Sequence, residues 1–155
     1  PVYLRFGRPK WPIFYPTDEK FEIGKAWKIQ DGADVSIFAT GHLVLKAIEA
    51  AKILVEQGYT VDLINIHTIK PLDVQAVIQS VSKTKCVVTA EEHQILGGLG
   101  SAIAKVVSEN TPAPIEYVGV HDKFGESGTA EQLLTKYGMS TQHVVDAALK
   151  VMARK

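Results

Sequence analysis

Several features are scarce in this chain of 155 residues, and each scarcity excludes a class of protein. Cys86 is the single cysteine, so no disulfide can form within the chain. No apolar run approaches the ~18 residues of a membrane span, and no basic-then-apolar leader opens the sequence. Lys and Arg number 17, as do Asp and Glu, so the net charge is zero, which argues against a nucleic-acid-binding surface. A cytoplasmic protein with no nucleic-acid or membrane partner is expected.

What the chain does contain is typical of a globular protein. Hydrophobic residues make up 46% and charged residues 22% of the sequence, and the length is enough to bury one normal core. Short apolar runs alternate with segments of helical periodicity, and this order predicts right-handed βαβ units. The predicted strands are 21–23, 26–29, 35–39, 60–66, 85–90 and 115–120, and the predicted helices are 43–57, 73–82, 97–109, 129–137 and 141–153.

These segments predict a three-layer α/β/α fold with a mostly parallel sheet of about five strands. One antiparallel edge strand is expected, because Asp31-Gly32 is typical of a tight hairpin turn with positive φ. Cys86 lies in an apolar run and is interpreted as a small buried hydrophobe.

The N-terminal residues predict a strand that belongs to another domain. Val2–Phe6 is apolar and begins at the first residue, which is not methionine. The chain is therefore expected to be the later part of a longer protein. Residues 1–20 are predicted to be the tail of a preceding domain plus an extended, proline-containing connector, and residues 21–155 one complete domain.

Arg8 is the first candidate for a binding residue. It follows the predicted strand and lies between Gly7 and Pro9, which together can fix the direction of the side chain. A guanidinium binds phosphate through two parallel hydrogen bonds and stays charged at any working pH. The alternative is an ordinary surface arginine.

Gly98, Gly100 and Ser101 form the second candidate, an anion site at the start of a predicted helix. The dinucleotide fingerprint is incomplete, because Ile103 stands where a third small residue is needed. The alternative is that glycine is needed for close packing of the helix on the sheet.

Glu91, Glu92 and His93 follow the carboxyl end of a predicted buried strand, where open α/β sheets bind ligands. A carboxylate and an imidazole can do acid–base chemistry. The favoured alternative is that one glutamate caps backbone groups and the others face water. The remaining histidines show no metal-ligand spacing, so no metal is assigned; they are His42, His67, His121 and His143.

Five segments, in order and at matching spacing, resemble motifs of the transketolase family over essentially the whole chain. Arg5–Pro9 is similar to the Arg-x-x-Arg-Pro at the end of the family's pyrimidine-binding domain. Similar motifs of the C-terminal domain follow in Phe21–Ala26, Thr68–Asp73, Thr89–Gly100 and Ser127–Leu134.

This resemblance implies the C-terminal section of a thiamine diphosphate-dependent transketolase that moves a two-carbon ketol unit between sugar phosphates in the pentose phosphate pathway. Thiamine diphosphate and magnesium bind elsewhere in the complete enzyme and neither is expected on this chain alone. Arg8 matches the arginine that holds the substrate phosphate, and no catalytic residue is assigned. An N-terminal section and a homodimer of the complete enzyme are the implied partners, and the implied role is scaffold and dimer interface.

Two other hypotheses remain open. The same fold and the Pro-Leu-Asp segment occur in the β subunit of 2-oxo acid dehydrogenases and in deoxyxylulose-phosphate synthase. A third class is a non-enzymatic regulatory module that binds an anion or nucleotide at Gly97–Gly100.

Overall fold

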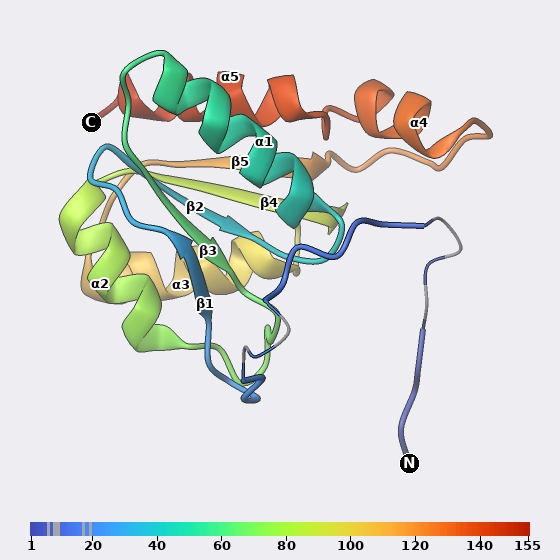
Figure 1. Cartoon of the computed structure of the whole chain (residues 1–155), viewed down its shortest axis with the longest axis horizontal. Helices are drawn as coiled ribbons and strands as arrows, with labels where there is room; N and C mark the ends of the chain where they lie inside the picture. Colours follow the sequence, from blue (N-terminus) through green and yellow to red (C-terminus); the bar gives the residue numbers. More distant parts are fainter. Residues whose placement is uncertain (6, 8–9, 17, 19) are drawn as a thin grey trace.

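The computed structural model of the chain describes residues 1–5, 7, 10–16, 18 and 20–155 (Figure 1). Within these residues five strands form one sheet: β1 (Trp27–Gln30), β2 (Val35–Ala39), β3 (Val61–Asn65), β4 (Val87–Gln94) and β5 (Ile115–Val120). The same residues form five helices: α1 (Leu43–Glu56), α2 (Val74–Thr84), α3 (Leu99–Asn110), α4 (Ala130–Lys136) and α5 (Thr141–Met152). No helix among them is long and apolar enough to span a lipid bilayer.

The sheet has the strand order β1-β3-β2-β4-β5. β2, β3, β4 and β5 are parallel, and β1 runs antiparallel to β3 at one edge. The predicted sheet is confirmed, but the predicted hairpin at Asp31-Gly32 is wrong because β3 lies between β1 and β2. Glycine is needed at position 32 for space: a Cβ there would lie 2.3 Å from backbone atoms of Val61.

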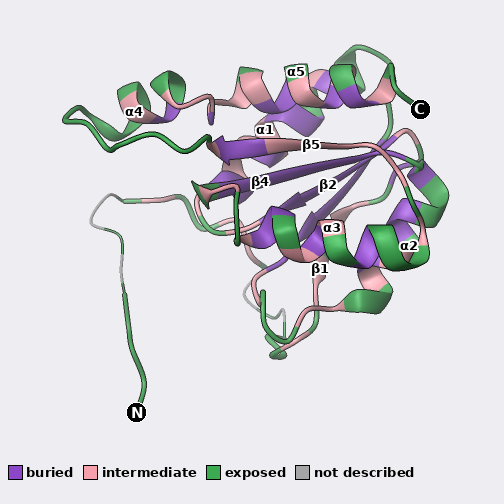
Figure 2. Cartoon of the chain, turned by 180° about the vertical axis from the view of Figure 1, so that it is seen from behind, coloured by how far each residue is buried: buried purple, intermediate pink, exposed green. Residues whose placement is uncertain are grey.

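Helices cover both faces of the sheet. Side chains alternate along β2, so Ile37 and Ala39 pack in the core beneath α1 and α5, whereas Phe38 packs beneath α2 and α3. Figure 2 shows the purple, buried strands between the two helical layers. Burial on both faces explains why the parallel strands are apolar runs rather than alternating patterns.

Local signals in the sequence set several helix ends. Asp73 caps α2 by accepting a hydrogen bond from the Ala76 N–H, as the sequence predicts, and Lys85 ends the helix with φ of 63°. Thr129 and Gln132 form a reciprocal capping box at the start of α4.

Two predicted strands do not form among the described residues. Residues 1–5 are exposed and lie outside the sheet, and Phe6 lies outside the described part of the chain. Residues 21–23 lead into a turn rather than a strand, because Gly24 has φ of +85° and packs against Pro71.

The connector, which we define as residues 10–16, packs on the domain rather than extending away from it. Trp11 and Phe14 contact the core beneath α1 and α5, and Tyr15 stacks on Trp27 with ring centroids 4.2 Å apart. In Figure 1 the connector runs from the start of α1 towards the end of β3. The contacts of this domain therefore begin ten residues before the boundary expected at residue 21.

Candidate functional site

The carboxyl edge of the sheet is the place where this architecture usually binds a ligand. The chain leaves β2 towards β3 on one side, whereas β4 lies on the other, so β2 and β4 form the topological switch point. The loop Thr40–His42 follows β2, and Glu91–Gln94 is the end of β4. The structure thus brings His42 beside the predicted acid–base cluster, although the two are 50 residues apart in the sequence.

Glu91 caps α3. The residue is 2% exposed, and its two carboxylate oxygens accept hydrogen bonds of 2.7 and 2.8 Å from the backbone N–H groups of Leu99 and Gly100. A negative charge at a helix N-terminus is stabilised by the unpaired N–H groups and by the helix dipole. The structural alternative considered for this cluster is therefore confirmed for Glu91.

The same capping fills the candidate anion site. A Cβ at Gly98 would lie 2.1 Å from the Glu91 carboxylate oxygen, so glycine is needed there for the carboxylate to approach the helix. The hydroxyl of Ser101 accepts a hydrogen bond from the Gly97 N–H and donates to the Ile95 carbonyl. An external anion at Gly98, Gly100 and Ser101 would have to displace Glu91.

Glu92 and His42 form a second contact, on the outer side of the same edge. His42 Nδ1 donates to the Glu92 carboxylate over 2.5 Å, and the Trp11 ring stacks on the imidazole at a centroid distance of 4.4 Å. Both side chains are partly exposed, at 33% for His42 and 48% for Glu92. The hydrogen bond and the ring stacking together link Glu92 of β4, through His42, to Trp11 of the connector.

The other histidines do not join one site. His93 Nδ1 donates to the Gln94 carbonyl, His143 is hydrogen-bonded to Ser140, His67 lies beside Phe21, and His121 is exposed. Among the described residues there is no group of three metal-ligating side chains. Arg8, the predicted phosphate-binding residue, lies outside the described part of the chain.

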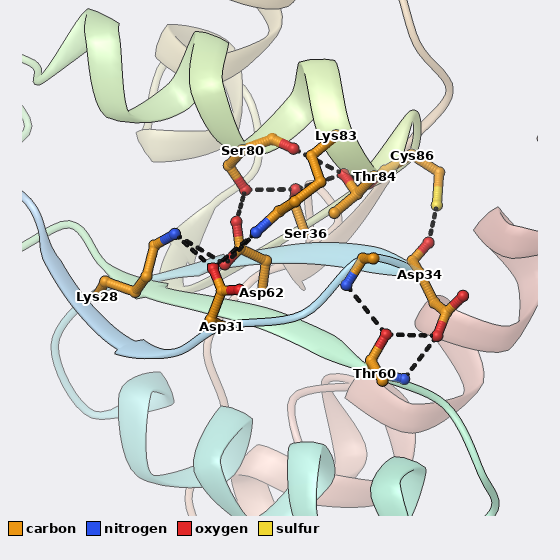
Figure 3. Close-up of polar contacts among 11 residues, drawn as sticks. Lys28, Asp31, Asp34, Ser36, Thr60, Asp62, Ser80, Lys83, Thr84 and Cys86 are labelled. Atoms are coloured by element: carbon orange, nitrogen blue, oxygen red, sulfur yellow. Dashed lines mark hydrogen bonds and ion pairs between the residues drawn. The ribbon is translucent and has the colours of Figure 1, made fainter.

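A charged network at the opposite edge was not singled out in the sequence (Figure 3). Lys28 and Lys83 both donate to Asp31, and both ammonium groups lie 3.3 Å from a carboxylate oxygen of fully buried Asp62. Hydrogen bonds from Lys28 and then Lys83 lower the pKa of Asp31 to about 2. The network balances two positive charges against two negative ones and lies at the amino end of the parallel strands, and both features indicate a stabilising role.

Polar side chains continue from this network into the core. Asp62 accepts a hydrogen bond from Ser80, which also contacts Ser36, and Ser36 in turn contacts Thr84. Burial raises the pKa of the Cys86 thiol, which donates to the Asp34 carbonyl. Cys86 is thus an inert buried residue, as interpreted from the sequence.

Two shallow cavities lie between α3 and β5, and neither is lined by His42 or Glu92. Their volumes are about 370 and 550 Å³, and both are lined by Ala104, Ser108 and Tyr117. The larger one also includes Ser101 and Leu96, and its lining is mostly apolar. Neither cavity gathers acid–base groups.

The fold agrees with comparisons to known proteins. The family model described as the transketolase C-terminal domain matches residues 24–144. The chain belongs to this family.

Two relatives illustrate the range of enzymes to which the chain is similar. A 6-deoxy-6-sulfo-D-fructose transketolase subunit of Clostridium sp. (strain MSTE9) is 46% identical over 156 residues, which cover 100% of this chain and 48% of the relative. A 1-deoxy-D-xylulose-5-phosphate synthase of Caldanaerobacter subterraneus subsp. tengcongensis is 34% identical over 152 residues, or 97% of this chain and 24% of that enzyme. The chain thus spans half or less of these relatives.

A solved structure shows the same fold. It is a split-gene transketolase described as an inactive β4 tetramer, 43% identical, with a TM-score of 0.89 over 92% of this chain and 46% of that one. The predicted family and fold are therefore confirmed.

The sequence did not reveal the aromatic contacts of the connector. The available signal was Trp11 before Pro12, with Phe14 and Tyr15 between Pro12 and Pro16, because three aromatic rings in a short proline-containing segment need a surface to cover them. Their partners lie too far along the chain for spacing to identify.

Proposed function

We propose that this chain is the C-terminal section of a thiamine diphosphate-dependent, transketolase-type transferase. It acts in the cytoplasm within a dimer of the complete enzyme, together with an N-terminal section. Its part is to support the neighbouring domain and the subunit interface, while the chemistry takes place on the other sections. The complete enzyme transfers a two-carbon ketol unit between sugar phosphates of the pentose phosphate pathway.

One observation carries the structural role: the chain itself fills the carboxyl edge of its sheet. Glu91 occupies the N-terminus of α3, and Trp11 lies on His42 at the switch point. The position at which open α/β sheets hold a ligand is thereby used for internal contacts. This favours a supporting domain over a regulatory module that binds a nucleotide.

The described residues do not fit thiamine diphosphate with its magnesium ion. The N–H groups at the start of α3 are bonded to a carboxylate, which would repel a diphosphate, and the described residues gather no three metal-ligating side chains. We therefore place the cofactor on the sections that this chain joins. Arg8, from which the family resemblance implies a phosphate contact, is the one substrate-binding residue proposed on this chain.

The test is reconstitution. The chain is co-expressed with a transketolase N-terminal section, and ketol transfer from xylulose 5-phosphate to ribose 5-phosphate is measured in the presence of thiamine diphosphate and magnesium. We expect transfer by the complex and none by this chain alone. Turnover by the isolated chain, or an inactive complex that is correctly assembled, contradicts the proposal.

The donor sugar is tested in the same assay. Because the chain is similar to a sulfofructose transketolase subunit, the assay also includes 6-deoxy-6-sulfo-D-fructose as a second donor. The similarity to deoxyxylulose-phosphate synthase favours that activity as the alternative function. Formation of 1-deoxy-D-xylulose 5-phosphate without ketol transfer would replace the first proposal by the second.

A further inference from the structure

We infer that the carboxyl edge of this sheet binds the chain's own connector, and that His42 and Glu92 are positioning residues that fix where the preceding segment leaves the domain. The inference about the connector is independent of the activity. Its consequence for substrate binding rests on the proposed function, in which Arg8 contacts a substrate phosphate.

The first contact holds the connector at the switch point. Trp11 stacks on His42 with an angle of 19° between the ring planes, and its indole Nε1 is buried. Glu92 holds the imidazole from the other side through a 2.5 Å hydrogen bond. Because Nδ1 is occupied by the carboxylate, the ring has one orientation in which its face meets the indole.

The second contact holds the connector four residues later, over β3 and β1. The Tyr15 hydroxyl accepts a hydrogen bond of 2.6 Å from the side-chain amide of Asn65 at the end of β3. Its ring stacks on Trp27 at the start of β1, with 25° between the planes. β1 is antiparallel, so its first residue lies at the same edge as the last residue of β3.

Two contacts at separate strands fix a direction as well as a position. Pro12 and Pro16 limit the backbone between and after them, and Ile13 points away from the core at 90% exposure. The connector therefore crosses the edge with Trp11, Phe14 and Tyr15 facing the domain, from the switch point towards β1. Arg8 precedes Trp11 by three positions, at most about 10 Å of extended chain.

The geometry assigns a different role to each member of the glutamate pair. Glu91 stabilises α3 from inside the domain, whereas Glu92 acts through His42 on a segment that leads out of it. Neither needs a substrate to explain its position. The partly exposed pair of His42 and Glu92 is thus explained by its contact with the connector rather than by acid–base chemistry.

Hydrogen exchange followed by mass spectrometry tests the support on the chain as it exists. In His42→Ala and Glu92→Gln, we expect the backbone amides of the non-proline residues of the connector to exchange at least about tenfold faster, while those of β2 and β4 are unchanged. His121→Ala and Glu109→Gln are matched controls, because both residues are exposed and far from the connector along the chain. Equal exchange of the connector in all four variants and the wild type overturns the inference.

Glu92→Gln keeps the size of an exposed side chain, so it tests the contact even if His42→Ala unfolds. A Gln that accepts the same hydrogen bond weakly should give a smaller rise in exchange than His42→Ala. A loss of protection throughout β2 and β4 in both variants would show a general loss of stability and overturn the positioning role.

The consequence for binding is measured in the reconstituted complex. With His42→Ala and Glu92→Gln we expect KM for the sugar phosphate to rise about three- to tenfold while kcat stays within about twofold, since the chemistry is elsewhere. An unchanged KM overturns the link to substrate, whatever the exchange data show. If the wild-type complex has no ketol-transfer activity, the proposed function fails, and the exchange experiment still decides the connector.

Discussion

Neighbouring residues of one strand take opposite roles in this domain. Glu91 and Glu92 are consecutive in β4, where successive side chains point to opposite faces of the sheet. Glu91 turns towards α3 and is buried, whereas Glu92 turns towards His42 and is half exposed. The sequence predicted that one of the pair caps a helix but could not say which, because strand register decides the face.

Removal of the Glu91 carboxylate should destabilise the whole domain. Glu91→Ala leaves the N–H groups of Leu99 and Gly100 buried without an acceptor, and we expect a loss of about 2–4 kcal/mol in the free energy of unfolding. Glu91→Gln keeps one acceptor and should lose less. Urea denaturation measures both, with Glu109→Ala as the control, because exposed ion pairs on a helix contribute only ~0.5 kcal/mol. A neutral Glu91→Ala contradicts the capping role.

Asp31 should make stability depend on pH in the acid range. Hydrogen bonds from Lys28 and Lys83 lower its pKa from 3.8 to about 2 in the folded chain, so its contribution is present above pH 3.8 and is lost as the pH falls towards 2. Asp31→Asn should therefore be less stable than the wild type at neutral pH, and the difference should shrink between about pH 4 and 2. Chemical denaturation across this range measures it. Asp18→Asn, at an exposed position, should not show the effect; a constant difference for Asp31→Asn would contradict it.

At the scale of elements, local sequence signals predicted most helices and strands, but they did not predict which strands pair with each other. β5 has the predicted bounds, and the cap of α2 at Asp73 is the residue that the sequence indicated. The hairpin was wrong because Asp31-Gly32 suits a turn, yet β1 finds its partner in β3, beyond β2. A strand chooses its neighbour by contacts that are distant in sequence, which a local pattern does not contain.

The connection between β4 and α3 also shows what the glycines do. At Gly98 an added Cβ would lie 2.1 Å from the Glu91 carboxylate, and at Gly100 it would lie 2.7 Å from the Tyr117 ring. Both positions therefore require space, the packing alternative that the sequence left open. An anion-binding role would not by itself create these collisions.

Alanine at these glycines separates packing from binding. We expect Gly98→Ala to lower the free energy of unfolding by at least about 2 kcal/mol, because Glu91 must leave the helix N-terminus to make room. Gly125→Ala is the matched control, since a Cβ there would meet nothing within 4 Å, and it should stay within ~0.5 kcal/mol of the wild type. Thermal unfolding in the absence of any anion is the measurement. If Gly98→Ala were as stable as Gly125→Ala, close packing would not be the reason for glycine.

At the scale of the whole molecule, the domain includes a segment that the sequence assigned to a linker. The residues of the connector contact the core beneath α1 and α5, whereas residues 1–5 are exposed. Composition and prolines predicted an ordered, extended segment but not where it lies. The contacts that hold it come from the ends of several strands, and only the folded sheet brings these together.

Two deletions test where the domain begins. Removing residues 1–9 should change the free energy of unfolding by no more than ~0.5 kcal/mol, because the described residues of this segment are exposed. Removing residues 1–16 also takes away Trp11, Phe14 and Tyr15 and should cost about 2–4 kcal/mol through lost apolar burial. Urea denaturation of the three chains gives the comparison. Equal stabilities of the two deleted forms would show that the connector contributes nothing to the domain.

The chain of hydroxyl groups from Ser36 to Ser80 and Thr84 has a consequence for how errors in assembly are avoided. Ser36 is fully buried in the centre of the sheet, and its hydroxyl is satisfied only where it meets α2. A slip of β2 by one residue would turn this hydroxyl into the opposite apolar layer, where it has no partner, and leave Ser80 and Thr84 of α2 facing a hydrocarbon side chain. A misaligned β2 is therefore higher in free energy than the native alignment, and one small polar residue helps to select the register of the central strand.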